Sequence, residues 1–118
     1  MTFSPKLKAA TALTALCVAL PFGVAQAQDA APLVIEMKDG TVSPQTIEIA
    51  ADTAVKLVVR NSGTSAAEFE SKRLKQEQVV APGTEVAIEL PSLPAGEYEF
   101  VDEFHEDQAS AQGVIVVK

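Results

Sequence analysis

The sequence predicts an all-β domain, an antiparallel sandwich or barrel, from three observations. Apolar and polar residues alternate with a period of two in several runs of five to seven residues. Glycine, proline, asparagine and aspartate separate these runs, as they do at the turns between strands. The 118 residues suit a single domain with one core.

The expected strands follow one another along the chain, divided by turn residues such as KDG, NSGTS and APG. They lie at residues 33–37 (LVIEM), 46–50 (TIEIA), 54–60 (AVKLVVR), 85–90 (EVAIEL), 97–101 (EYEFV) and 113–117 (GVIVV). Residues 71–80 are ambiguous, since SKRLKQEQVV fits a short helical turn that leads into a strand.

The first 27 residues have the features of a cleavable export signal. Lys6 and Lys8 precede an apolar run that ends at residues 25–27 in AQA, a small-x-small cleavage site. Pro21 breaks this run, which is shorter than the roughly 20 apolar residues of a membrane span. We expect a signal peptide at 1–27, a flexible leader at 28–32, a domain at 33–118 and no membrane insertion after cleavage.

The composition argues against several classes of function. Removing the two lysines of the signal from nine basic residues leaves seven against sixteen acids, a net charge of −9. Such a surface repels the phosphates of nucleic acids and anionic lipids, so we expect no nucleic-acid partner. Cys17 is the only cysteine and lies in the signal. The mature chain therefore has no disulfide, no thiolate nucleophile and no thiolate metal ligand.

The only histidine, His105, lies within six residues of five carboxylates in the stretch YEFVDEFHEDQ. The five are Glu99, Asp102, Glu103, Glu106 and Asp107. The stretch is either a solvated turn or half of a metal site. Hard oxygen donors with one imidazole suit iron, manganese or zinc better than Cu(I).

The fragment LPAGEY, residues 93–98, resembles the tyrosine corner of Greek-key sandwiches, in which the tyrosine hydroxyl caps a crossing of the backbone. Tyr98 is the only tyrosine of the chain.

The terminal pattern Y-x-F, then a loop, then G-x-I-x-V resembles the cupredoxins. Residues 43–61 and 79–100 also resemble successive strands of that fold, a Greek-key β-sandwich. In copper-carrying cupredoxins, a histidine follows the strand that ends in asparagine, a cysteine follows the Y-x-F strand, and a second histidine comes next. Here Glu68 and Asp102 stand at the first two positions and His105 at the third. Blue copper needs a thiolate, so a blue-copper electron carrier is excluded.

Two stretches, EFESKRLKQEQVVAPG and YEFVDEFHEDQASAQGVIVVK, resemble the EfeO-type cupredoxin-like domains. They are most similar to the small periplasmic FtrB-type proteins that accompany bacterial ferrous iron permeases. This resemblance implies an iron-binding protein of the periplasm, with a periplasmic iron-binding protein and an inner-membrane iron permease as partners. It implies metal ligation by Glu68 and Glu70 from the first stretch and by Asp102, Glu103 and His105 from the second.

Strand alternation places Glu68 and Glu70 on one face and Phe69 in the core. We expect Phe104 to pack inward, and Met37 to be either a core residue or a weak sulfur ligand.

Three functions stay open. The first is a metal-binding accessory of iron uptake with iron as its metal, which could assist ferrous oxidation or electron transfer; whether it is an enzyme is undecided. The second is a metal-free acidic module that docks on a permease or an iron-binding protein. The third is a periplasmic chaperone that binds Cu(II) through His105.

Overall fold

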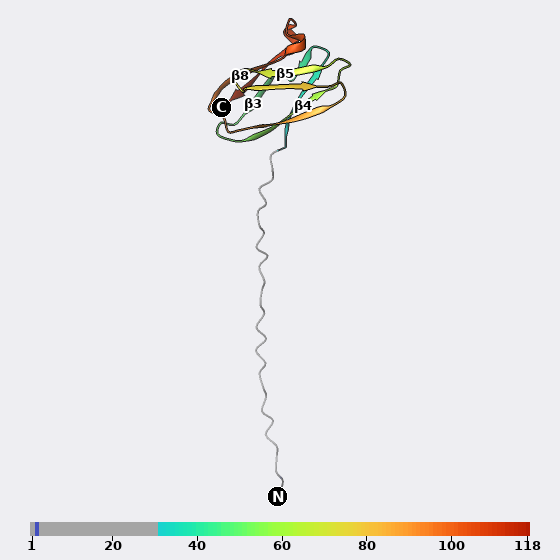
Figure 1. Cartoon of the computed structure of the whole chain (residues 1–118). Coiled ribbons are helices and arrows are strands. Elements are labelled where there is room, and N and C mark those ends of the chain that lie inside the picture. Colours follow the sequence, from blue (N-terminus) through green and yellow to red (C-terminus); the bar gives the residue numbers. More distant parts are fainter. Residues whose placement is uncertain (1, 3–30) are drawn as a thin grey trace.

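The computed structural model describes residue 2 and residues 31–118 of the chain. The described part consists of strands and two short 3-10 helices (Figure 1). These are β1 (Leu33–Lys38), β2 (Thr41–Ser43), β3 (Thr46–Ile49), β4 (Val55–Asn61), β5 (Ala67–Ser71), β6 (Gln76–Val80), β7 (Glu85–Leu90), β8 (Gly96–Asp102), η1 (Glu103–His105), η2 (Ala109–Ala111) and β9 (Gln112–Val117). The predicted signal peptide, and the predicted leader up to residue 30, lie outside the described residues. A search of the described residues found no helix with the length and apolar character of a membrane span.

The strands form two sheets packed as a sandwich, which confirms the predicted fold class. One sheet has the order β2-β1-β4-β7, and the other has the order β3-β9-β8-β5-β6. Both sheets are mixed, because β1 pairs with β4 and β3 pairs with β9 in parallel. The expectation of a purely antiparallel arrangement is therefore wrong for these two pairs. The chain changes sheet between β2 and β3 and returns at β4, which lets β4 run alongside β1.

The core lies between the sheets and is filled by the inward residues of each alternating strand. Ile35, Leu57 and Val59 are fully buried there. Phe69 is also fully buried, as predicted, and its ring stacks on that of Phe100 with centroids 5.3 Å apart. Burying each such side chain stabilises the fold by roughly 1.5–3 kcal/mol.

Residues 71–80 form a turn that leads into a strand, as expected, but the turn belongs to a β-hairpin and is not helical. Residues 72–75 are the turn, in which the N–H of Lys75 donates to the carbonyl of Lys72 (3.2 Å) and Lys75 has a φ of 55°. Strand β6 then returns antiparallel to β5. The hairpin places Glu77 directly opposite Glu70.

The tyrosine corner is confirmed. The hydroxyl of Tyr98 donates to the carbonyl of Pro94 at 2.8 Å, across the turn into β8. The guanidinium of Arg73 lies 4.4 Å from the centre of the same ring. The corner fixes the start of β8, whose other end leads into η1 and the candidate site.

Candidate metal centre

Strand β5 lies between β6 and β8, and its alternation separates two kinds of side chain. Phe69 points into the core, so Glu68 and Glu70 leave the opposite face of the strand. Phe69 pairs with Asp102 at the end of β8, which makes Asp102 an inward residue and directs the next residue, Glu103, toward the outer face. Three segments therefore bring acidic side chains to one place on the outside of the five-stranded sheet.

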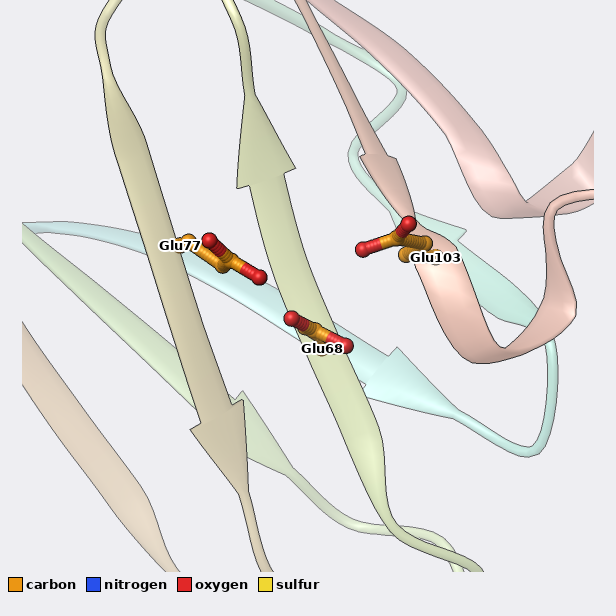
Figure 2. Close-up of side chains that lie close together, drawn as sticks. All are labelled: Glu68, Glu77 and Glu103. Carbon is orange, nitrogen blue, oxygen red and sulfur yellow. The ribbon is translucent and has the colours of Figure 1, made fainter.

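The carboxylates of Glu68, Glu77 and Glu103 form a cluster between β6, β5 and η1 (Figure 2). Each offers one oxygen, and these atoms all lie within 4.8 Å of one another. Glu68 occupies the middle and is only 8% exposed, whereas Glu103 is half-buried and Glu77 is exposed. We call these three residues the carboxylate cluster.

Among the described residues, no lysine, arginine or histidine side chain forms an ion pair with the cluster. The ion pairs of residues 31–118 involve other carboxylates, those of Glu85, Asp102 and Glu48. In the part of the chain that the structure describes, no N–H donates to the side chain of Glu68, and the N–H of Glu68 itself donates to Asp102. The neighbouring side chains that shift its charge are themselves carboxylates, those of Glu77, Glu103 and Glu70.

This environment raises the pKa of Glu68 above its ordinary value of 4.5. The first cause is burial, which disfavours the charged form. A hydrogen bond shared with the side chain of Glu77 and the negative charges of Glu103, Glu77 and Glu70 act in the same direction. Burial, a hydrogen bond with Glu70 and the surrounding acids raise the pKa of Glu103 as well. A cation placed among these oxygens would offset the lost solvation of the charged carboxylates and the repulsion between them.

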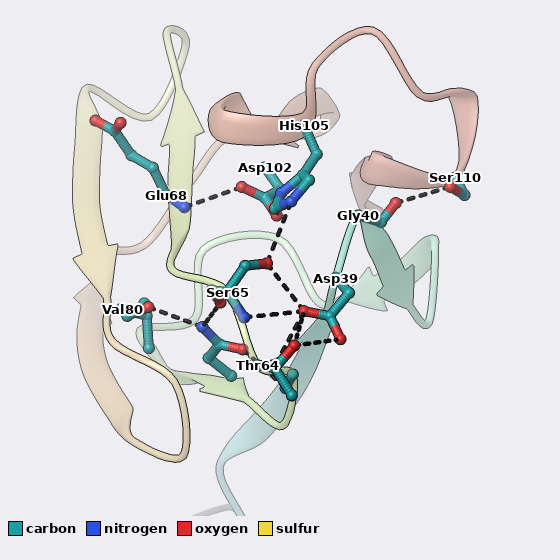
Figure 3. A network of polar contacts seen from close by, with 11 residues as sticks. Asp39, Gly40, Thr64, Ser65, Glu68, Val80, Asp102, His105 and Ser110 are labelled. Carbon is teal, nitrogen blue, oxygen red and sulfur yellow. Dashed lines mark hydrogen bonds and ion pairs between the residues drawn. The ribbon is translucent and has the colours of Figure 1, made fainter.

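A second group of polar side chains joins the end of β8 and η1 to the loop before β5 and the turn after β1 (Figure 3). The carboxylate of Asp102 is 1% exposed and accepts from the N–H of Glu68 at 3.0 Å. Its other oxygen lies 2.7 Å from Nδ1 of His105, and Nε2 of His105 lies 3.3 Å from the hydroxyl of Ser65. Ser65 in turn donates to Asp39 at 2.9 Å. We call Asp39, Ser65, His105 and Asp102 the histidine network.

The five predicted ligands therefore fall into two groups. Glu68 and Glu103 meet in the carboxylate cluster, and Glu70 lies near enough for its negative charge to raise the pKa of both. Asp102 and His105 belong to the histidine network, and the carboxylate of Glu68 points away from His105 (Figure 3). The two groups share a backbone contact, from the N–H of Glu68 to Asp102, but no side-chain contact between Glu68 and His105 is observed.

The sequence reasoning missed Glu77. The sequence could have indicated it, because a hairpin with its turn at residues 72–75 places Glu77 beside the outward residues of β5. Two further expectations also resolve. Phe104 does not pack inward but is 52% exposed, because η1 turns His105 toward Ser65 and leaves Phe104 outside. Met37 is a fully buried core residue.

The two groups differ in the chemistry they can perform. The carboxylate cluster offers hard oxygen donors, which suit iron, manganese, magnesium or calcium and not Cu(I). The histidine network offers one imidazole whose Nδ1 already faces a buried carboxylate. It links the loop before β5 to η1, and so connects segments that carry the cluster.

Comparison with known proteins identifies the family. Residues 9–117 match the family model of the cupredoxin-like domain. An uncharacterised protein of Rickettsia prowazekii (strain Madrid E), RP394, is 36% identical over 83 residues, which are 70% of this chain and 65% of that protein. The chain thus spans just under two thirds of the length of this relative.

Solved structures share the fold at low sequence identity. A purple cupredoxin from Nitrosopumilus maritimus superposes with a TM-score of 0.54 and 18% identity, covering 73% of this chain and 99% of that one. Auracyanin from Roseiflexus castenholzii gives a TM-score of 0.60 and 12% identity, covering 74% and 96%. The metal-binding domain of the Cu(I)-exporting ATPase CopA of Streptococcus pneumoniae D39, solved with Cu(I), gives 0.60 and 13%, covering 74% and 84%. With the sandwich, the tyrosine corner and the family match in agreement, the chain belongs to the cupredoxin-like domain family.

Proposed function

We propose that this chain is a metal-binding accessory protein of iron uptake, and that it binds iron at the carboxylate cluster. The observation that carries the proposal is the side chain of Glu68. The residue as a whole is 8% exposed, and the carboxylates of Glu77, Glu103 and Glu70 act on its side chain within the described chain. Buried carboxylates are normally paired with a cation or a donor. A bound metal ion would neutralise the negative charge that these carboxylates bring together.

The donor set supports iron among the possible metals. Three carboxylates are hard ligands, and their negative charge stabilises Fe(III) more than Fe(II). A ferrous ion bound there would become easier to oxidise, which fits a role beside a ferrous iron permease. The resemblance of EFESKRL and DEFHED to the FtrB-type proteins supports the same role, in the periplasm and with a permease and an iron-binding protein as partners.

The proposal is tested by anaerobic titration of the purified protein with Fe(II), Mn(II), Zn(II) and Cu(II). We expect saturable binding of Fe(II) and Mn(II) that weakens at least tenfold in Glu68→Gln and in Glu103→Gln. The matched control is Glu89→Gln, because Glu89 is an exposed glutamate of β7, in the other sheet, and its loss changes the net charge equally. Equal weakening in Glu89→Gln would reduce the effect to general charge, and no binding by the wild-type protein would refute the proposal.

A second candidate, a Cu(II)-binding protein, rests on His105. Its imidazole is 19% exposed and stands beside the buried carboxylate of Asp102, a nitrogen and oxygen pair suited to Cu(II). The structurally similar CopA domain was solved with Cu(I). In this case Cu(II) would bind most tightly, and His105→Ala would abolish its binding while Glu68→Gln would not. If the wild-type protein binds none of these metals, the acidic docking module is the remaining function.

A further inference from the structure

Asp102 is connected to both principal residues of the carboxylate cluster, although its side chain points to the other face. One oxygen of Asp102 accepts from the N–H of Glu68 at 3.0 Å. Through the chain, Asp102 directly precedes Glu103 and occupies the N-cap position of η1. Its buried carboxylate therefore joins the backbone of β5 at Glu68 to the start of the segment that carries Glu103.

His105 closes this connection from the other end of η1. Its Nδ1 lies 2.7 Å from the second oxygen of Asp102, so the two side chains span the three residues of the helix. Its Nε2 contacts Ser65, which lies two residues before β5. Both ends of η1 are thus held against β5 or the loop that leads into it, and Glu103 lies between the two attachments.

We propose that Asp102 and His105 are positioning residues that set the separation between Glu68 and Glu103, rather than ligands of the metal. The inference rests on the proposed function, because it assigns a role in the same metal centre. It reassigns the only imidazole of the chain from the metal to the support of a site made of oxygen ligands.

The order Ser65, His105, Asp102 also matches the arrangement of a hydrolase triad, and the contacts of Ser65 decide against that role. The hydroxyl of Ser65 donates to Asp39 at 2.9 Å, which is shorter than its 3.3 Å contact with His105. The N–H groups of Thr64 and Ser65 donate to Asp39 as well, so they are not free to stabilise an oxyanion. The network holds the loop in place.

The test compares variants of Asp102 that differ only in the contacts they keep. Asp102→Ala removes both attachments, whereas Asp102→Asn keeps an oxygen for the N–H of Glu68 and a polar partner for His105. Supporting residues of this kind typically change metal affinity by about 10- to 100-fold. We expect Mn(II) to bind at least tenfold more weakly to Asp102→Ala, with substantial recovery in Asp102→Asn. His105→Ala, which leaves the contact with Glu68 intact, should weaken binding to an intermediate extent.

Two controls separate positioning from loss of stability and from direct ligation. Tyr98→Phe removes the partly buried hydrogen bond at the tyrosine corner, at the far end of β8 from η1, so it lowers stability and should leave the Mn(II) affinity unchanged. All titrations are made at a temperature at which circular dichroism shows each variant folded. Pulsed electron paramagnetic resonance of bound Mn(II) then reports whether an imidazole nitrogen is coupled to the metal, and we expect no such coupling.

Each outcome is decisive. A folded Asp102→Ala that binds Mn(II) within twofold of the wild-type protein overturns the positioning role while the metal centre stands. A nitrogen coupling that disappears in His105→Ala makes His105 a ligand and overturns it too. A wild-type protein that binds neither Mn(II) nor Fe(II) overturns the proposed function and this inference together.

Discussion

Asn61 ends β4 and holds three parts of the molecule together, so its replacement should destabilise the domain strongly. It is 1% exposed. Its Nδ2 donates to the carbonyls of Ser65 (2.8 Å) and Val80 (2.9 Å), and its Oδ1 accepts from the N–H of Gly63 (2.9 Å). The amide therefore fixes the loop before β5 and joins it to the end of β6. The perturbation is Asn61→Ala, which removes all three hydrogen bonds.

The expected loss follows from the number of bonds. Each intramolecular hydrogen bond contributes about 1 kcal/mol net, so three give about 3 kcal/mol. In a domain of this size, 1 kcal/mol shifts Tm by roughly 4–8 °C, so Asn61→Ala should lower Tm by about 12–24 °C. Asn61→Asp should cost more than Asn61→Ala, because a carboxylate oxygen would replace the donor and face two carbonyls.

The assay is urea denaturation followed by circular dichroism, with the thermal midpoint as a second measure. Gln78→Ala is the control, since Gln78 is exposed on β6 and its loss should change stability by less than about 0.5 kcal/mol. A loss below about 1 kcal/mol in Asn61→Ala, or a smaller loss in Asn61→Asp than in Asn61→Ala, would refute the three bonds as assigned.

Three further predictions concern pH and packing. Folding raises the pKa of Glu68 above 4.5. The folded protein therefore holds this proton at pH values where the unfolded chain has lost it. As a consequence, the free energy of unfolding of the metal-free protein should rise as the pH falls from 7 toward 4.5. Urea denaturation across this range should show the rise in the wild-type protein and a smaller one in Glu68→Gln; a flat wild-type profile would contradict it. Hydrogen bonds from Ser65 and Thr64 lower the pKa of Asp39 from 3.8 to about 2, so its stabilising contribution is present above 3.8 and lost between 3.8 and about 2. Acid melts should show this loss, and its persistence in Asp39→Asn would disprove the assignment. Finally, Gly63→Ala would place a Cβ 2.7 Å from the backbone nitrogen of Asp39. This overpacking should lower the free energy of unfolding by about 1–3 kcal/mol in urea denaturation. The control is Ser62→Ala, because Ser62 is the exposed neighbour.

Most of the fold could be predicted because strand alternation is a local property of the sequence. The run at 85–90 matches β7 at both ends, and the other expected strands overlap the observed ones closely. The parallel pairs β1–β4 and β3–β9 could not be predicted in this way. Which strands become neighbours depends on packing between distant segments, and the periodicity of one strand carries no information about its partner.

The candidate site was predicted in part for a related reason. Alternation correctly placed Glu68 and Glu70 on the outer face with Phe69 in the core. Alternation holds to the end of β8 and directs Asp102 inward, whereas Glu103, the next residue in the chain, joins the cluster on the opposite face. The prediction that Asp102 and Glu103 bind one ion combined residues that the sheet places in separate groups, the histidine network and the carboxylate cluster. Their role as ligands or supports stays a prediction until metal binding is measured.

The place of β9 in the five-stranded sheet has a consequence for how the domain folds. Strand β9 lies between β3 and β8, so the last strand of the domain is an interior member of its sheet and pairs with one of the earliest. A chain that emerges from the ribosome amino end first cannot complete this sheet until residues 112–117 are free. Such distant pairings slow folding to the millisecond-to-second range. The five-stranded sheet should therefore close only after residues 112–117 have left the ribosome, so the segments up to β8 wait without their interior partner strand.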